Sequence, residues 1–164
     1  MNIITRSFLF ASILTTYGCL GGGTHGSIKT YEYQVSKATL EKAIWKVINL
    51  SVNIQRDTSK NYYNDSMNYY NDSVMYITIK IRKGEIENDY TFRYGGGKEY
   101  WDTAIKSSIF IAYAFDKQGN GGSEGNGGIR WYKPVLKKKL ISVFESEFVS
   151  KVDKVLGVNH TEPD

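Results

Sequence analysis

The chain has 164 residues, 41% of them hydrophobic, and a formal charge of +4 at pH 7, which is enough for one domain with a buried core. The small basic excess is scattered and does not indicate nucleic-acid binding, and the densest basic run, residues 137–139, is typical of a solvated helix face. With Cys19 as the only cysteine, no intramolecular disulfide can form, so stability must come from packing.

The chain begins with the residue order of an export signal. Arg6 is the only charged side chain before Cys19, an apolar run occupies residues 8–14, and Gly18 directly precedes the cysteine. An apolar run of this length is too short to span a bilayer and is typical of a signal peptide. Residues 16–19 resemble the lipobox of bacterial lipoproteins.

This resemblance implies a lipid anchor. In lipoproteins the signal peptide, here residues 1–18, is removed and the cysteine, here Cys19, carries acyl chains such as palmitate; several such chains hold a protein to a membrane permanently. Leu20 stands where an aspartate tends to favour the inner membrane, so the resemblance implies the outer membrane, facing the periplasm. Thr16 and Tyr17 depart from the usual aliphatic and small residues. The alternative is an ordinary signal-peptide cysteine or an uncleaved anchor.

A tether and the first elements of the domain follow. Residues 19–27 are rich in glycine and predict a flexible tether. Residues 28–35 alternate, with the odd-numbered side chains the more apolar, and predict a strand. Ser36 can cap a helix, and apolar residues at helical spacing predict an amphipathic helix over 37–50.

A seven-residue tandem repeat occupies residues 61–74, first as NYYNDSM and then as NYYNDSV. Two copies are too few for a solenoid, and the Asn and Asp content argues against a coiled coil. A duplication within a loop fits, because doubling a loop's length costs only about 0.6 kcal/mol of closure entropy.

Three further strands are predicted by the alternation of side chains over residues 75–81, 90–94 and 109–115. A Lys-Gly pair at 83–84 predicts a hairpin after the first of them. The glycine-rich stretch 119–128 predicts a mobile loop.

A long helix is predicted near the C-terminus. Pro134 suits its first turn, and Gly157 suits its C-cap. Its apolar stripe consists of Leu136, Leu140, Phe144, Phe148, Val152 and Val155. Residues 158–164 are expected to form a disordered tail.

Residues 28–157 are therefore predicted to form a single α+β domain. The strands cluster as hairpins and do not alternate strictly with helices. This order favours an antiparallel sheet of about four strands with two helices packed on one face, in the order β-α-β-β-β-α.

Side chains suited to catalysis are sparse. His25 falls in the tether and His160 in the tail, so neither predicts a histidine-based triad or a zinc site. The loop after Asp116 lacks the acidic ligand of a calcium loop at its twelfth position. Glu99 and Asp102 would need to face each other across a cleft to cleave a sugar, which the sequence does not indicate. The sequence therefore predicts no cofactor, no metal and no enzymatic activity.

Tyrosine and tryptophan are abundant, with thirteen and three copies, and several fall in polar segments. These side chains provide a large contact area with a polar group, so they anchor protein interfaces and stack on sugars. The alternative is that they pack in the core or on the sheet. The candidate binding residues are Tyr62, Tyr63, Tyr69, Tyr70, Tyr100, Trp101, Trp131 and Tyr132.

These features together predict a lipid-anchored protein of the cell envelope whose non-catalytic domain binds a protein partner. An immunity or inhibitor protein that neutralises a toxin would have this form. The expected partners are the membrane, through Cys19, and a protein, with a glycan possible and nucleic acid not expected. One alternative is a protein that binds glycan or peptidoglycan through Tyr100, Trp101, Trp131 and Tyr132. The other is an enzyme using Glu99, Asp102 or Asp116.

Overall fold

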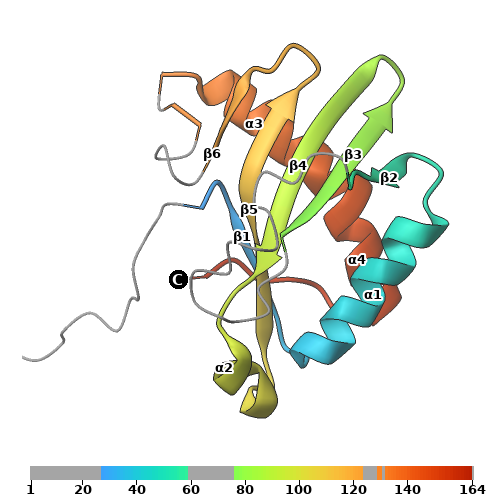
Figure 1. Cartoon of the computed structure of the whole chain (residues 1–164), viewed down its shortest axis with the longest axis vertical. Coiled ribbons are helices and arrows are strands. Elements are labelled where there is room, and N and C mark those ends of the chain that lie inside the picture. Colours follow the sequence, from blue (N-terminus) through green and yellow to red (C-terminus); the bar gives the residue numbers. More distant parts are fainter. Residues whose placement is uncertain (1–26, 59–75, 124–128, 131, 164) are drawn as a thin grey trace, which may run out of the picture.

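Antiparallel strands form one sheet, and the long helices lie behind it in the view of Figure 1. The computed structural model describes residues 27–58, 76–123, 129–130 and 132–163. The elements in chain order are β1 (Thr30–Tyr33), α1 (Lys37–Leu50), β2 (Ile54–Arg56), β3 (Ile77–Lys83), β4 (Ile86–Tyr94), α2 (Lys98–Thr103), β5 (Ser107–Asp116), β6 (Gly121–Ser123), α3 (Pro134–Phe144), the π-helical segment η2 (Glu145–Val149) and α4 (Ser150–Leu156).

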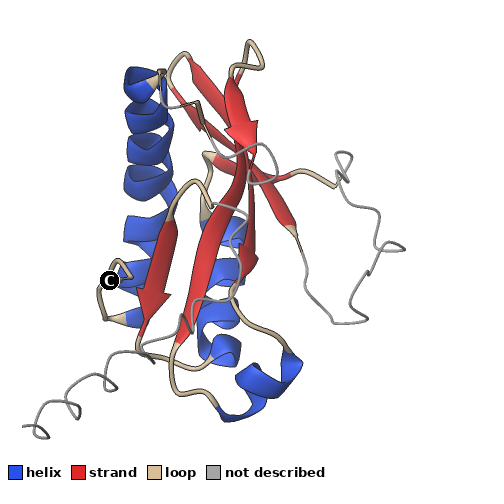
Figure 2. Cartoon of the chain, turned by 90° about the vertical axis from the view of Figure 1, so that its left-hand side faces the viewer, coloured by secondary structure: helices blue, strands red, loops and turns tan. Residues whose placement is uncertain are grey.

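The predicted α+β class and the antiparallel sheet are confirmed. Within the described residues the sheet has six strands, in the order β1-β5-β4-β3-β2, and β6 pairs with β5 on the same side as β1. The helices α1 and α4 pack against each other, and Figure 2 shows α3 and α4 running along one face of the sheet.

The prediction of about four strands and two helices was wrong in detail. The strand β2 has only three residues, too few to show an alternating pattern. The strand β6 falls in the glycine-rich stretch expected to be a loop, and a Cβ on Gly121 would collide with the carbonyl oxygen of Ala114 on β5. Because glycine lets the two backbones approach closely, its presence there supports pairing as well as a turn. The short helix α2 lies between two of the predicted strands, where the sequence predicted no helix.

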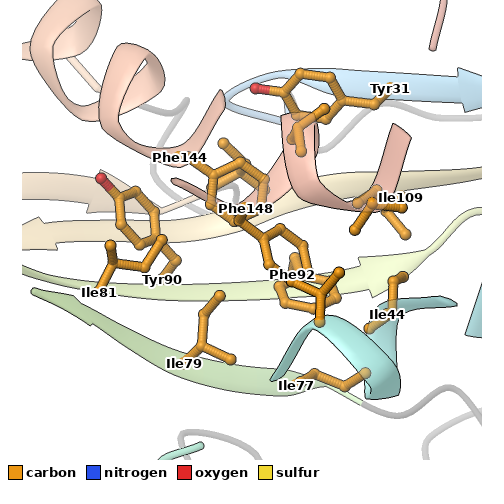
Figure 3. Packing of buried hydrophobic residues seen from close by; sticks show 14 of the residues in the cluster. Tyr31, Ile44, Ile77, Ile79, Ile81, Tyr90, Phe92, Ile109, Phe144 and Phe148 are labelled. Atoms are coloured by element: carbon orange, nitrogen blue, oxygen red, sulfur yellow. The ribbon is translucent and has the colours of Figure 1, made fainter. Parts of the chain in front are cut away.

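The core lies between the helices and the sheet. Three phenylalanines meet at its centre: the ring centroids of Phe92 and Phe148 are 5.0 Å apart, as are those of Phe144 and Phe148 (Figure 3). Such tilted ring pairs add about 0.5–1.5 kcal/mol each beyond the area that they bury. The fully buried residues around them include Tyr31, Ile44, Ile77, Ile79, Ile81, Tyr90 and Ile109.

The predicted helix over 37–50 is confirmed, with the same bounds. The Ser36 side chain accepts a hydrogen bond from the backbone N–H of Thr39, which satisfies one of the donors left open at a helix start. Its predicted apolar face, which consists of Leu40, Ala43, Ile44, Val47 and Ile48, is buried.

The predicted C-terminal helix begins at Pro134 and ends at Gly157, which has a positive φ of 69°, but its middle turn is π-helical. Among its buried residues, Leu140, Phe144, Phe148 and Val152 repeat every four positions, and Val143 and Val149 are buried beside them. In a 3.6-residue helix each four-residue step turns about 40° too far, so an α-helix cannot keep all four on one face. The wider π turn of η2 corrects this drift. Val155, placed in the stripe by the sequence, is 38% exposed.

The C-terminal segment, expected to be disordered, pairs with β1. The backbone N–H groups and carbonyls of Glu32 and Thr161 exchange two hydrogen bonds, both 2.8 Å long. His160 Nδ1 lies 2.9 Å from a carboxylate oxygen of Asp153, and its ring packs edge-on against Tyr31. We call residues 159–163 the C-terminal strap. The strap covers the outer edge of β1, which would otherwise expose unpaired backbone groups.

Candidate functional site

Three of the eight predicted binding residues lie in the described part of the chain: Tyr100, Trp101 and Tyr132. The predicted lipidation site Cys19, the four tyrosines of the tandem repeat and Trp131 lie outside the described residues.

Trp101 holds α2 against the domain. Its indole N–H donates a hydrogen bond of 2.8 Å to the carbonyl of Gly95, and its ring lies edge-on to Tyr94 with centroids 6.4 Å apart. The ammonium of Lys37 lies 4.7 Å from the Tyr94 ring centroid and 5.1 Å from that of Trp101. These contacts occupy both the ring and the N–H group of Trp101, so its observed role is structural.

Two exposed apolar side chains lie at this end of the molecule. Tyr100 on α2 is 42% exposed and Ile105, in the loop after α2, is 82% exposed. Only a long hydrogen bond of 3.4 Å joins the Tyr100 hydroxyl to the carbonyl of Lys106. We call Tyr100 and Ile105 the α2 tip.

Tyr132 lies elsewhere. It is 57% exposed and stands two residues before Pro134, the first residue of α3. Figure 1 shows the start of α3 at the opposite end of the molecule from α2. The described members of the predicted set therefore do not form one continuous aromatic platform.

A shallow groove of about 490 Å³ runs between α3 and the beginning of β1. Its α3 residues recur at intervals of three and four, so they occupy one face of the helix, different from the buried face that carries Leu140, Val143 and Phe144. We call it the α3 groove; its lining residues are Lys29, Pro134, Lys137, Lys138, Ile141, Ser142 and Glu145.

Lys29 connects the groove to η2 and to the C-terminal strap. Its Nζ lies 2.8 Å from Glu145 and 2.7 Å from Glu162. Burial alone would lower the pKa of Lys29, but the hydrogen bonds to the two carboxylates outweigh it and raise the pKa. The Tyr31 hydroxyl also donates to Glu145, over 3.4 Å, and burial raises the pKa of Tyr31. The positive charge of Lys29 is therefore paired with two carboxylates.

Four basic residues at and before the start of α3 remain exposed, and two of them, Lys137 and Lys138, line the groove. We call this set the basic rim: Arg130, Lys133, Lys137 and Lys138. None of them has a carboxylate within 4.0 Å in the described structure. Residues 129–144 contain five basic side chains and no acid. The sequence shows this run of charge, but only the fold places Lys29 and the chain entering β1 beside it.

A second, smaller cavity lies at the β2 edge. It measures about 230 Å³ and is lined by Gln55, Arg56, Asp57, Lys80 and Arg82. Its cations are already engaged, because Glu87 lies 2.8 Å from Arg82 and 3.0 Å from Lys80. Their hydrogen bonds lower the pKa of Glu87 to about 2.

The acids considered for catalysis do not form a cleft. Glu99 and Asp102 are exposed on α2, and the Asp116 carboxylate accepts hydrogen bonds from the backbone of Gln118 and Asn120 in its own turn. Within the described ranges, no three His, Cys, Asp or Glu side chains are grouped so that they could hold a metal ion.

Comparison with known proteins gives no family: no family model, curated protein or solved structure matches this chain. A search of the described helices for one long and apolar enough to cross a bilayer also finds none.

Proposed function

We propose that the protein is a cell-envelope lipoprotein, anchored through Cys19, whose non-catalytic domain binds a protein partner. The anchor is supported by the sequence from Arg6 to Cys19, with its short apolar run and single cysteine. An immunity or inhibitor role belongs to this class, since such a protein needs a rigid surface and no catalytic group.

The observation that carries the binding role is the α2 tip. Tyr100, on a short helix that Trp101 fastens to the core, and Ile105, in the loop after that helix, expose apolar surface. Exposed aromatic and aliphatic side chains on a fixed element lose little conformational entropy on binding, which is why such residues dominate protein interfaces. We place the partner's contact at this end of the domain.

Affinity capture of the full-length protein from its own cells, after mild crosslinking and with mass spectrometry, tests this function. We expect one dominant protein partner. Changing Tyr100→Ala together with Ile105→Ala should weaken the purified complex about tenfold or more, because two central contacts are lost.

The matched control is Leu50→Ala with Val52→Ala. These residues are 72% and 106% exposed but lie at the end of α1 and in the turn after it, so their loss should leave the affinity unchanged. Capture of cell-wall material alone would contradict a protein partner and favour the glycan alternative. Equal weakening by both double variants would reject the α2 tip as the contact.

A further inference from the structure

The α3 groove and its basic rim carry an excess of positive charge. Together with the nearby Glu162 they include five basic and two acidic side chains, and both acids are paired with Lys29. The remaining four cations, those of the basic rim, are exposed. A surface of this kind attracts an anionic surface, and each basic residue near an anionic membrane strengthens binding about fivefold.

The groove also lies where the chain enters the domain. Ser27 is the first described residue, and Lys29, two positions later, lines the groove. Ser27 is eight positions after Cys19, so these two residues are at most about 29 Å apart whatever conformation the intervening segment takes. A lipid on Cys19 would therefore keep the groove close to the bilayer surface and raise the effective concentration of headgroups around it.

Apolar side chains accompany the basic rim. Tyr132 is 57% exposed and Val135 is 80% exposed, and both belong to the turn and helix start that carry Lys133 and Lys137. Tyrosine is enriched at the level of lipid headgroups because its ring is apolar and its hydroxyl is polar. Basic residues mixed with a few apolar ones are typical of surfaces that lie on a membrane.

We propose that the α3 groove and basic rim bind the phosphate headgroups of anionic phospholipids in the membrane that holds the anchor. The inference rests on the proposed anchoring through Cys19, which provides the nearby bilayer. In this orientation the start of α3 faces the membrane, and the α2 tip, at the other end of the molecule, faces away from it.

The test uses the chain from residue 19 with Cys19→Ser, so that no acyl chain contributes to binding. The buried core lies between Ile28 and Val152, so this chain retains the whole domain. Binding is measured by sedimentation of the protein with lipid vesicles. Vesicles of phosphatidylglycerol and phosphatidylcholine in equal parts are compared with vesicles of pure phosphatidylcholine. We expect binding to the anionic vesicles alone, decreasing as salt is added.

The decisive variants reverse the charge of two exposed lysines at a time. Lys137→Glu with Lys138→Glu should weaken binding to the anionic vesicles about tenfold or more. Lys42→Glu with Lys46→Glu, on exposed positions of α1, makes the same change in net charge and should have a small effect. Equal circular dichroism spectra and urea midpoints would show that both variants fold.

Absence of binding to the anionic vesicles, or equal weakening by the two double variants, would overturn the proposal. A third outcome would assign the basic rim to an acidic protein instead. In that case the parent does not bind the vesicles, and the variant with Lys137→Glu and Lys138→Glu no longer captures the protein partner. The vesicle assay uses unlipidated protein, so a negative result there does not bear on the anchor. Lipidation of Cys19 is tested separately, by the mass of the N-terminal peptide.

Discussion

Tyr90 shows how one buried polar group joins the sheet to α3. Its ring is fully buried, its hydroxyl donates to the carbonyl of Leu140 over 2.8 Å, and it accepts a hydrogen bond of 2.9 Å from the Asn88 side chain. Burying a hydroxyl costs little free energy when both of its hydrogen-bond partners are in place. A buried donor or acceptor that loses its partner lowers the stability of the fold.

We expect Tyr90→Phe to lower the free energy of unfolding by about 1–3 kcal/mol, because the Asn88 amide loses a buried acceptor. Urea denaturation measures this. Tyr100→Phe is the control, since its hydroxyl is at the surface, and it should change stability by less than about 0.5 kcal/mol. Equal effects of the two substitutions would show that the Tyr90 hydroxyl has no special role.

Glu87 should give the domain part of its acid sensitivity. Hydrogen bonds from Arg82 and then Lys80 lower its pKa from 4.5 to about 2 in the folded protein. Its contribution is therefore fully present above the unfolded pKa and is lost as the pH falls toward 2. We expect Glu87→Gln to make the loss of stability between about pH 4.5 and 2 shallower, as measured by urea midpoints across that range.

Glu99→Gln is the control for this pH profile, because Glu99 is exposed on α2 and has no ion pair in the described structure. It should leave the slope of stability against pH as in the parent. A Glu87→Gln profile that matches the parent at every pH would mean that other carboxylates determine acid unfolding.

At the scale of elements, η2 explains how one helix keeps Leu140, Phe144, Phe148 and Val152 in line. A single π turn inserts one residue into an α-helix while the flanking turns keep their phase. Deleting Ser146, which is exposed within η2, should therefore convert the segment to α-helix and leave Phe144 and Phe148 in the core. We expect a folded protein destabilised by about 2 kcal/mol or less.

Deleting Lys46, an exposed residue in the middle of α1, is the matched control. There no π turn absorbs the change, so Val47 and Ile48 rotate by about 100° out of the core, at a cost of about 4 kcal/mol or more. Circular dichroism and urea unfolding distinguish the two deletions. If the Ser146 deletion is as damaging as the Lys46 deletion, the π turn does not act as a removable insertion.

The C-terminal strap should stabilise β1. Truncation after Val158 removes the two backbone hydrogen bonds with Glu32 and the His160 ring on Tyr31. We expect a loss of about 2 kcal/mol in the free energy of unfolding, measured with urea. Glu162→Gln keeps the backbone pairing and should leave the urea midpoint close to that of the parent, because an exposed ion pair contributes little. An unchanged midpoint after truncation would show that the strap adds nothing.

Local patterns in the sequence predict the elements that depend on local contacts. The helical spacing of apolar residues and the Ser36 cap were sufficient to predict α1. The alternation of side chains was sufficient to predict the three long strands. The strand β6 and the strap were missed because both are ordered by backbone pairing, with β5 and β1 respectively. Side-chain periodicity carries no signal of such pairing.

The candidate surfaces were only partly predictable for the same reason. The aromatic content indicated Tyr100 and Tyr132, but it could not show that Trp101 is held by Gly95 or that α2 and the start of α3 lie at opposite ends of the domain. The α3 groove depends on Lys29 reaching Glu145, 116 positions later in the chain, and no sequence motif encodes that contact.

At the scale of the whole molecule, the proposed anchor, the basic rim and the α2 tip together define an orientation of the domain relative to the membrane. The chain enters β1 beside the α3 groove, and the start of α3 and the helix α2 lie at opposite ends of the domain (Figure 1). A short tether and a basic surface would together orient the domain on an anionic bilayer and present the α2 tip to a partner.

The mass of the N-terminal peptide, from protein isolated from the membranes of its own cells, tests the account most directly. We predict that the chain begins at Cys19 and that this peptide carries acyl chains, and that Cys19→Ser releases the protein from the membrane. An unmodified Cys19, or an N-terminus that retains residues 1–18, would contradict the anchor on which this orientation depends.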